Sequence, residues 1–177
     1  MSMFEELVKI NCFSQNKETK REAAALLERE YGCEINCIEI SESVRFAHNG
    51  RGCTIVAAKL CENVVIFQNV TIGSNQKFNR KTNQWENLGN PILGPNVIVA
   101  DGAKILGPIT IGENTVVGAG AIITKSTPAN SVAYGVNHFK PKDKDYDLVF
   151  HSEMPAYEDI IAANQVLIEA YNAASKK

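Results

Sequence analysis

Aliphatic residues recur every six positions through the middle of this chain, a spacing that fits neither an α-helix nor an ordinary strand. The unbroken series is Leu93, Val99, Ile105, Ile111, Val117 and Ile123. Four residues after each member comes a small or branched residue, giving Val97, Ala103, Ile109, Thr115, Ala121 and Thr127. Both series need one interior, so the pattern predicts short flat strands joined by tight turns. Three such strands close a triangular coil of about 18 residues that stacks on the next coil.

The same six-residue step continues upstream of a polar interruption. Its members are Leu60, Ile66 and Ile72, with Ala58, Val64 and Val70 as the paired series. Residues 74–91 between the two blocks are polar, contain the only tryptophan, Trp85, and have no apolar period of their own. We therefore expect a loop ejected from one corner of the coil. The loop is either a tolerated surface insertion or a wall of a binding site on a neighbouring subunit.

Helix-forming sequences flank the repeat on both sides. Residues 17–31 are rich in strong helix formers, and Gly32 follows as a helix-ending residue. Residues 156–174 follow Pro155 and carry an apolar stripe. Its members are Ile160, Ile161, Ala163, Val166, Leu167 and Tyr171. We expect this C-terminal helix to lie against an apolar surface.

Composition and charge narrow the class of protein. The chain has 177 residues and a mass of 19.4 kDa, with 45% apolar and 21% charged residues, which is typical of one compact domain. A formal charge of -2 provides no basic field for a nucleic acid. There is no apolar run of about 18 residues and no basic start typical of a secretory signal. These features favour a cytoplasmic protein that binds neither nucleic acid nor membrane.

The five cysteines indicate reduced thiols. Cys12, Cys33, Cys37, Cys53 and Cys61 are odd in number and contain no CxxC pair, so neither a disulfide framework nor a metal site is expected. No cysteine stands in an evident nucleophile setting beside a base, which argues against a covalent acyl-enzyme.

Short motifs within the repeat add a family resemblance. In order they are His48-Asn49-Gly50, then residues 68–73 (QNVTIG), residues 101–107 (DGAKILG) and residues 118–121 (GAGA), followed by Pro128 and Gly135. This run resembles the left-handed parallel β-helix acyltransferases, and serine acetyltransferase and its relatives in particular. The resemblance implies a mainly β fold with a helical segment at 1–37, a left-handed β-helix at 38–140 and a linker and helix at 141–177.

The resemblance implies a catalytic role for His48. In the family, the matching histidine is the general base that removes the proton from the acceptor hydroxyl, a role that suits a ring titrating near neutrality. The plain alternative is a hydrogen-bonded corner residue. Asn49 and Asn90 are the expected acceptor contacts. Asn90 stands where the family has a second histidine, and Glu34 or Glu39 is the candidate for the aspartate that orients the base.

Acetyl-CoA is the co-substrate that the resemblance implies, bound between the subunits of a homotrimer. Small residues would let the pantetheine arm lie close to the coils: Gly73, Ala103, Gly120 and Ala121. Lys125, Lys140 and Lys142 are candidates for contacting the phosphates, and His138 and His151 are expected on the surface.

The leading hypothesis is an acetyl-CoA-dependent O-acetyltransferase acting on a small hydroxyl acceptor, with L-serine as first choice. Two alternatives stay open. Asn90 and the short N-terminal segment also suit a sugar O-acetyltransferase of capsule or exopolysaccharide synthesis. The departures from the family motifs also suit a catalytically inactive β-helix that serves as a binding module.

Overall fold

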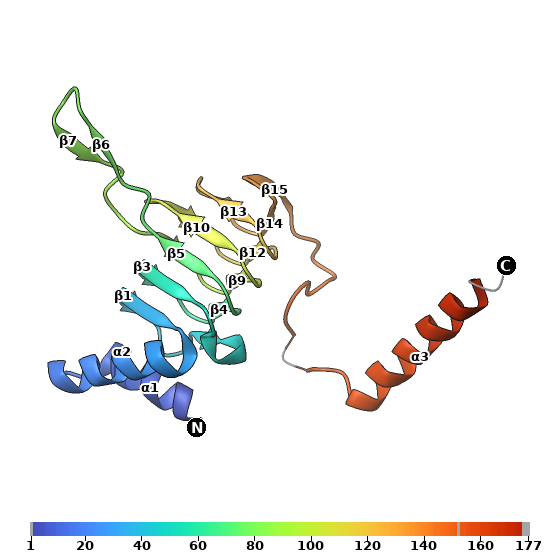
Figure 1. The fold of residues 1–177 in the computed structure, drawn as a ribbon. Coiled ribbons are helices and arrows are strands. Elements are labelled where there is room, and N and C mark those ends of the chain that lie inside the picture. The colour runs from blue at the N-terminus through green and yellow to red at the C-terminus, as the bar shows by residue number, and fades with distance from the viewer. Residues whose placement is uncertain (1, 152, 175–177) are drawn as a thin grey trace.

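The chain folds into a helical cap, a parallel β-helix and a separate C-terminal helix (Figure 1). A computed structural model describes residues 2–151 and 153–174. Helices α1 (Met3–Phe13) and α2 (Lys17–Tyr31) precede the strands, and α3 (Tyr157–Ala174) follows them. As the sequence indicates, α2 ends at Gly32, which adopts the left-handed conformation at φ 59°. None of the helices in the described ranges is long and apolar enough to cross a bilayer.

Short parallel strands stack into three faces of the β-helix, two of which are joined into one sheet by β3. One sheet has the order β11-β8-β3-β5-β10-β13 with β1 added on β3, and the other has the order β15-β14-β12-β9-β4-β2. The first coils contain β1 (Glu34–Ile40), β2 (Arg45–Phe46), β3 (Thr54–Leu60), β4 (Val65–Ile66) and β5 (Thr71–Gly73). The later coils contain β8 (Ile92–Leu93), β9 (Ile98–Val99), β10 (Lys104–Leu106), β11 (Thr110–Ile111), β12 (Val116–Val117) and β13 (Ile122–Ile123). The parallel β-helix predicted from the six-residue period is confirmed, and its first strand begins at Glu34.

The six-residue series forms the core. Leu93, Val99, Ile105, Ile111, Val117 and Ile123 are completely buried, and the second series from Val97 to Thr127 is buried as well. One expected position differs, because Ala58 is half-buried and Ala57 is buried in its place. The cause is β3, which continues as one strand for seven residues, pairing with β5 at its beginning and with β8 at its end. Strand side chains alternate with a period of two, which buries Ile55 and Ala57, and the alternation breaks before the buried Leu60.

Asparagines in the left-handed conformation form one corner of the β-helix. Asn63, Asn96, Asn114 and Asn130 have φ between 54° and 58°. The first three each donate through Nδ2 to the Oδ1 of the next asparagine at 3.1 Å. The short amide side chain tolerates this backbone conformation and also links successive coils.

Substitutions of Asn96 separate these two contributions. We expect Asn96→Ala to lower the free energy of unfolding by about 2 kcal/mol, since it loses both amide contacts and places an alanine in the left-handed region. Asn96→Gly loses the same contacts without the backbone strain and should cost about 1 kcal/mol less. Urea unfolding of both variants measures the difference. Equal losses would contradict a role for the backbone conformation.

Residues 74–91 leave the β-helix after β5 and return at β8 as a projecting hairpin (Figure 1). Strands β6 (Lys77–Asn79) and β7 (Gln84–Glu86) pair antiparallel, and the rings of Phe78 and Trp85 meet edge to face at 5.4 Å. The Asn79 side chain accepts hydrogen bonds from the N–H groups of Lys81 and Thr82 and so forms the turn. The expected ejected loop is therefore present. It forms a regular hairpin, which its polar composition does not indicate.

Both ends of the β-helix are covered. Helices α1 and α2 lie beyond β1, where Phe4 packs against Tyr31 and Phe46, and the Asn11 amide donates to the Ile35 carbonyl. At the other end, β14 (Ser131–Tyr134) turns back into the antiparallel strand β15 (His138–Pro141). The chain then continues through a linker to α3. No described residue of α3 is buried, so the apolar surface expected for this helix is not provided by its own chain.

Candidate functional site

His48 lies in a tight turn with an unusual backbone. The turn Ala47–Gly50 follows β2, and His48, Asn49 and Gly50 all have left-handed φ angles of 53°, 56° and 55°. Gly50 is buried, and a Cβ there would lie 3.0 Å from both Cys33 Sγ and Phe4 Cζ. The buried glycine thus fixes the turn, while His48 and Asn49 are exposed. Successive non-glycine residues in this region are strained, and such strain gathers at functional sites.

The His48 ring packs beside an aromatic ring in the next coil. Its centroid lies 5.9 Å from that of Phe67. Phe46 pairs with Ile66, and Ile66 with Val99, so Gln68 and Asp101 stand in successive coils at the register of His48. Across the described part of the chain, no carboxylate pairs with the imidazole. The ring is therefore open on one side for an acceptor hydroxyl.

The two acidic residues considered for orienting His48 have other partners. Glu34 accepts a hydrogen bond from the Asn36 amide at 2.7 Å. Glu39 pairs with the Lys59 ammonium at 2.8 Å, which holds the pKa of the Glu39 carboxyl below its usual range. Neither contacts His48, so the structure gives neither the orienting role.

Gln68 is a polar side chain at this place to which the sequence assigned no role. Its Oε1 atom is buried and accepts no hydrogen bond from any described residue. A buried acceptor without a donor costs free energy unless a ligand or a partner supplies one. The signal available in sequence was its place in the motif at residues 68–73, which says nothing about the missing donor.

Two of the small residues expected to contact acetyl-CoA lie at the β-helix surface. Gly120 is exposed, with φ 66°, and stands at the register of Gly102, which has φ 71°. Gly73 is half-buried at the end of β5, with open space where a Cβ would project. Both positions leave room for a ligand to approach the backbone.

Ala103 and Ala121 lie inside instead. Both are completely buried. Their carbonyls accept from the N–H groups of Thr71 and Lys104, and their own N–H groups bond to Ala100 and Gly118. They support the corner from the core, and the structure shows no free main-chain donor on either.

The lysines expected near phosphates lie around the last coils. Lys125 and Lys140 are exposed, and Lys142 is half-buried. The Lys140 ammonium lies 5.7 Å from the centre of the Tyr134 ring, which also stacks on His138 at 5.5 Å. His151 pairs with Asp147 at 2.8 Å in the linker. His138 and His151 are both exposed, and neither contacts His48.

Of the two asparagines expected to contact the acceptor, only Asn49 adjoins His48. Asn90 lies at the end of the hairpin segment, half-buried beside Gly89, whose φ is 142°. Asn49 is exposed on the left-handed turn. Within the single chain, no hydrogen bond joins either amide to a described residue.

The cysteines are shielded rather than reactive. Burial raises the pKa of the Cys12 thiol to about 11 and those of Cys33 and Cys37 to about 12. It also raises the pKa values of Cys53 and Cys61. A nucleophilic cysteine needs a lowered pKa, so these thiols are unsuited to carry an acyl group.

Comparison with known proteins places the chain in a family. The family described as bacterial transferase hexapeptide (six repeats) matches residues 90–125. Serine acetyltransferase of Staphylococcus aureus (strain Mu50 / ATCC 700699) is 30% identical over 169 residues, which cover 90% of this chain and 75% of that protein. The chain belongs to the serine acetyltransferase family. A serine acetyltransferase of Staphylococcus xylosus is 36% identical over 92 residues, which cover 51% of this chain and 39% of that protein.

Solved structures agree with this membership at the level of the fold. A structure titled as serine acetyltransferase in complex with CoA matches with a TM-score of 0.56 and 21% identity, covering 75% of this chain and 52% of that one. The serine acetyltransferase of Neisseria gonorrhoeae matches with a TM-score of 0.57 and 22% identity, covering 82% and 52%. This family member therefore spans about half the length of the solved structures that it matches.

Proposed function

We propose that this chain transfers the acetyl group of acetyl-CoA to the hydroxyl of L-serine. The observation that carries the proposal is the 30% identity to serine acetyltransferase over 90% of the chain. The position of His48, exposed on a strained turn at the edge of the β-helix, supports it independently. The CoA complex among the structures of similar fold supports acetyl-CoA as the donor.

His48 acts as the general base in the proposed reaction. Its imidazole takes the proton from the serine hydroxyl while that oxygen attacks the thioester carbonyl carbon. The tetrahedral intermediate collapses with cleavage of the C–S bond. The imidazolium then returns the proton to the leaving thiolate, so that O-acetylserine and CoA are the products. No acyl-enzyme forms, in keeping with the raised pKa values of the cysteine thiols.

The acetyl-CoA site is proposed to lie beside the small residues at the surface of the β-helix. Gly73 and Gly120 leave space beside the backbone, and Lys125, Lys140 and Lys142 supply cations near the last coils for phosphate groups. The proposal places this site at the seam between subunits of a homotrimer. At this seam a neighbouring subunit would supply contacts that one chain does not provide. They would reach Asn49, Asn90 of the hairpin segment and the unpartnered side-chain Oε1 of Gln68. A cytoplasmic location stays a prediction.

A sugar hydroxyl is the second candidate acceptor. It is favoured by Asn90, because the matching family position is a histidine that can change its charge and an amide cannot. The side-chain amide of Asn90 instead offers N–H donors and a carbonyl acceptor, which suit the hydroxyl groups of a neutral polyol.

One assay separates these candidates. Release of CoA thiol is measured with the full chain, acetyl-CoA and, at equal concentration, L-serine or a panel of sugars and nucleotide sugars. We expect L-serine to give a rate at least ten times that of any sugar. A faster sugar would transfer the function to the second candidate. Absence of thiol release with every acceptor, together with no thermal stabilisation by acetyl-CoA, would favour a binding module.

A further inference from the structure

Helix α3 has an apolar face that its own chain leaves uncovered. Tyr157, Ile160, Ile161, Leu167 and Ile168 gather on one side of the helix and are 42–72% exposed. Val166, which the sequence pattern placed in this stripe, lies on the opposite side instead, since each residue turns the helix by about 100°. A helix of 18 residues with several branched side chains is only marginally stable alone in water. The stripe therefore needs a partner surface.

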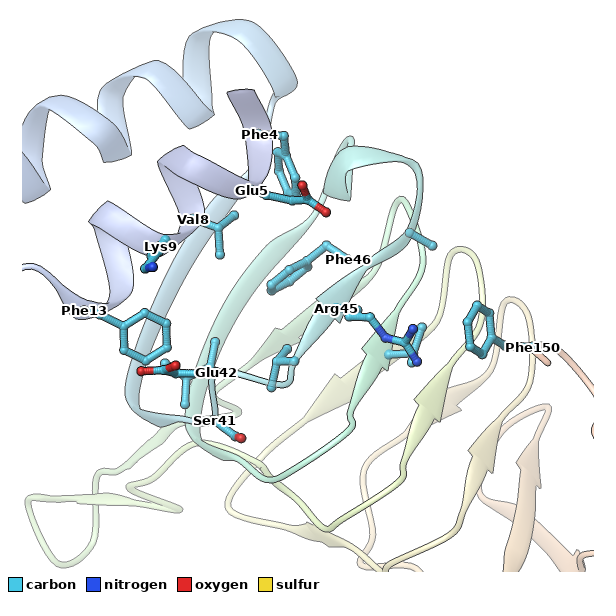
Figure 2. Close-up of a pocket in the computed structure, with 14 residues that line it drawn as sticks. Phe4, Glu5, Val8, Lys9, Phe13, Ser41, Glu42, Arg45, Phe46 and Phe150 are labelled. Atoms are coloured by element: carbon cyan, nitrogen blue, oxygen red, sulfur yellow. The ribbon is translucent and has the colours of Figure 1, made fainter. Parts of the chain in front are cut away.

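An apolar groove of about 690 Å³ lies beside α1, and it is also unfilled. Figure 2 shows α1 along one side of the groove and the segment of residues 40–47 along the other. Its apolar lining consists mainly of Phe4, Val8, Phe13, Ile40, Val44 and Phe46. A cavity of this size and lining is large enough to receive several side chains from one face of a helix.

The linker before α3 leads directly to this groove. Phe150 lines it, with the Arg45 guanidinium 4.9 Å from the centre of its ring. The chain thus returns from β15 at the last coil to β2 at the first. Helix α3 begins seven residues after Phe150 but extends away from the β-helix (Figure 1). A helix that leaves from the groove of its own chain is placed to enter the groove of a neighbouring copy.

Charged residues accompany both surfaces. The α3 segment contains Glu158, Asp159 and Glu169 and has no lysine or arginine. The groove is flanked by Lys9 and Arg45 (Figure 2). Glu5 and Glu42 also line it, and Glu5 keeps its charge while it accepts the backbone N–H of Ser2 at 2.7 Å, so the groove carries equal numbers of cations and anions.

We propose that α3 of one copy docks in the groove between α1 and residues 40–47 of a second copy, so that neighbouring subunits exchange their C-terminal helices. The stripe on α3 offers on the order of 600 Å² of apolar surface, close to the roughly 800 Å² per partner of a standard interface. In a closed ring the contact is repeated at every seam. Neither the acceptor nor acetyl-CoA enters this contact.

Photo-crosslinking tests the exchange directly. Full-length protein carries a photoreactive benzoylphenylalanine in place of Ile168, and copies labelled with ¹⁴N and ¹⁵N are mixed during assembly. We expect mixed-isotope adducts between α3 and residues 4–13 or 40–47. The matched variant carries the same group in place of Val166 and should give few adducts with the groove. Adducts within one copy, adducts between two α3 helices, or no adducts to the groove would each overturn the proposal.

A pair of substitutions tests the energetic side. Ile168→Asp places a carboxylate in the proposed contact, and we expect at least a tenfold weaker self-association by light scattering across a dilution series. Val166→Asp adds the same charge on the other side of α3 and should leave association unchanged. Equal behaviour of the two variants would contradict docking through the stripe. These measurements need no substrate, so their failure is distinct from a failure of the acetyltransferase proposal.

Discussion

His48→Asn lowers the turnover number for acetyl transfer to L-serine by about 100-fold or more. Asparagine tolerates the left-handed backbone of position 48 as histidine does, so the turn at Ala47–Gly50 is retained. Its amide cannot take up a proton at neutral pH, so the acceptor hydroxyl loses its base. The measurement is steady-state release of CoA thiol at saturating acetyl-CoA and serine. Circular dichroism and light scattering check that fold and assembly are unchanged.

The matched control for this variant is His138→Asn. His138 is exposed on β15 and stacks on Tyr134, and the proposed mechanism gives it no proton to move. The control should retain turnover within about twofold of the parent. Near-parental turnover by His48→Asn would remove the proposed mechanism. A comparable loss in both variants would instead indicate a general disturbance of the surface.

Ile123→Ala is expected to lower the free energy of unfolding by about 3 kcal/mol. Ile123 is completely buried in the last complete coil, so its truncation removes apolar contacts and leaves a cavity. The adjacent Ile122 is 40% exposed and provides the control on the same strand. Ile122→Ala should cost no more than about 1 kcal/mol. Urea unfolding of both variants measures the two losses, and similar values would contradict an inward-facing six-residue series.

The six-residue period was enough to predict the core of this fold because each coil repeats one geometry. Ile72, Ile105 and Ile123 are all buried at the same place in successive coils, so each repeat confirms the others. The pattern failed where the geometry changed. Strand β3 continues across a corner as one strand, and there Ala57 takes the buried position expected for Ala58. A propensity or period within β3 alone does not reveal that its two ends pair with the two strands that flank the ejected hairpin, β5 and β8.

The candidate site was less predictable because it depends on contacts between coils. The motif singled out His48, but its neighbours in space come from the next coils, where Phe67 supplies the packed ring and Gln68 the unsatisfied carbonyl. The acidic residues Glu34 and Glu39 were reasonable candidates by position, and both form contacts with residues nearer to them. Side-chain competition of this kind is set by distances that a linear sequence does not contain.

The apolar stripe of α3 shows the same limit. Its spacing correctly indicated a helix at Tyr157–Ala174, since periodicity is a local property. The surface that covers the stripe is not local, and the helix has no buried residue within its own chain. The sequence indicated that the helix needs an apolar partner surface, but it did not identify that surface.

The two ends of the β-helix determine the direction in which copies of the chain can associate. A stack of parallel strands with bare edges would recruit further chains along its axis and grow into a filament. Here the pair α1 and α2 blocks one edge, and β15, running antiparallel on β14, terminates the other. Another copy cannot extend the parallel stack past α1 and α2, and at the other end it would meet β15, whose direction is reversed, so the flanks are left as the surfaces through which copies meet.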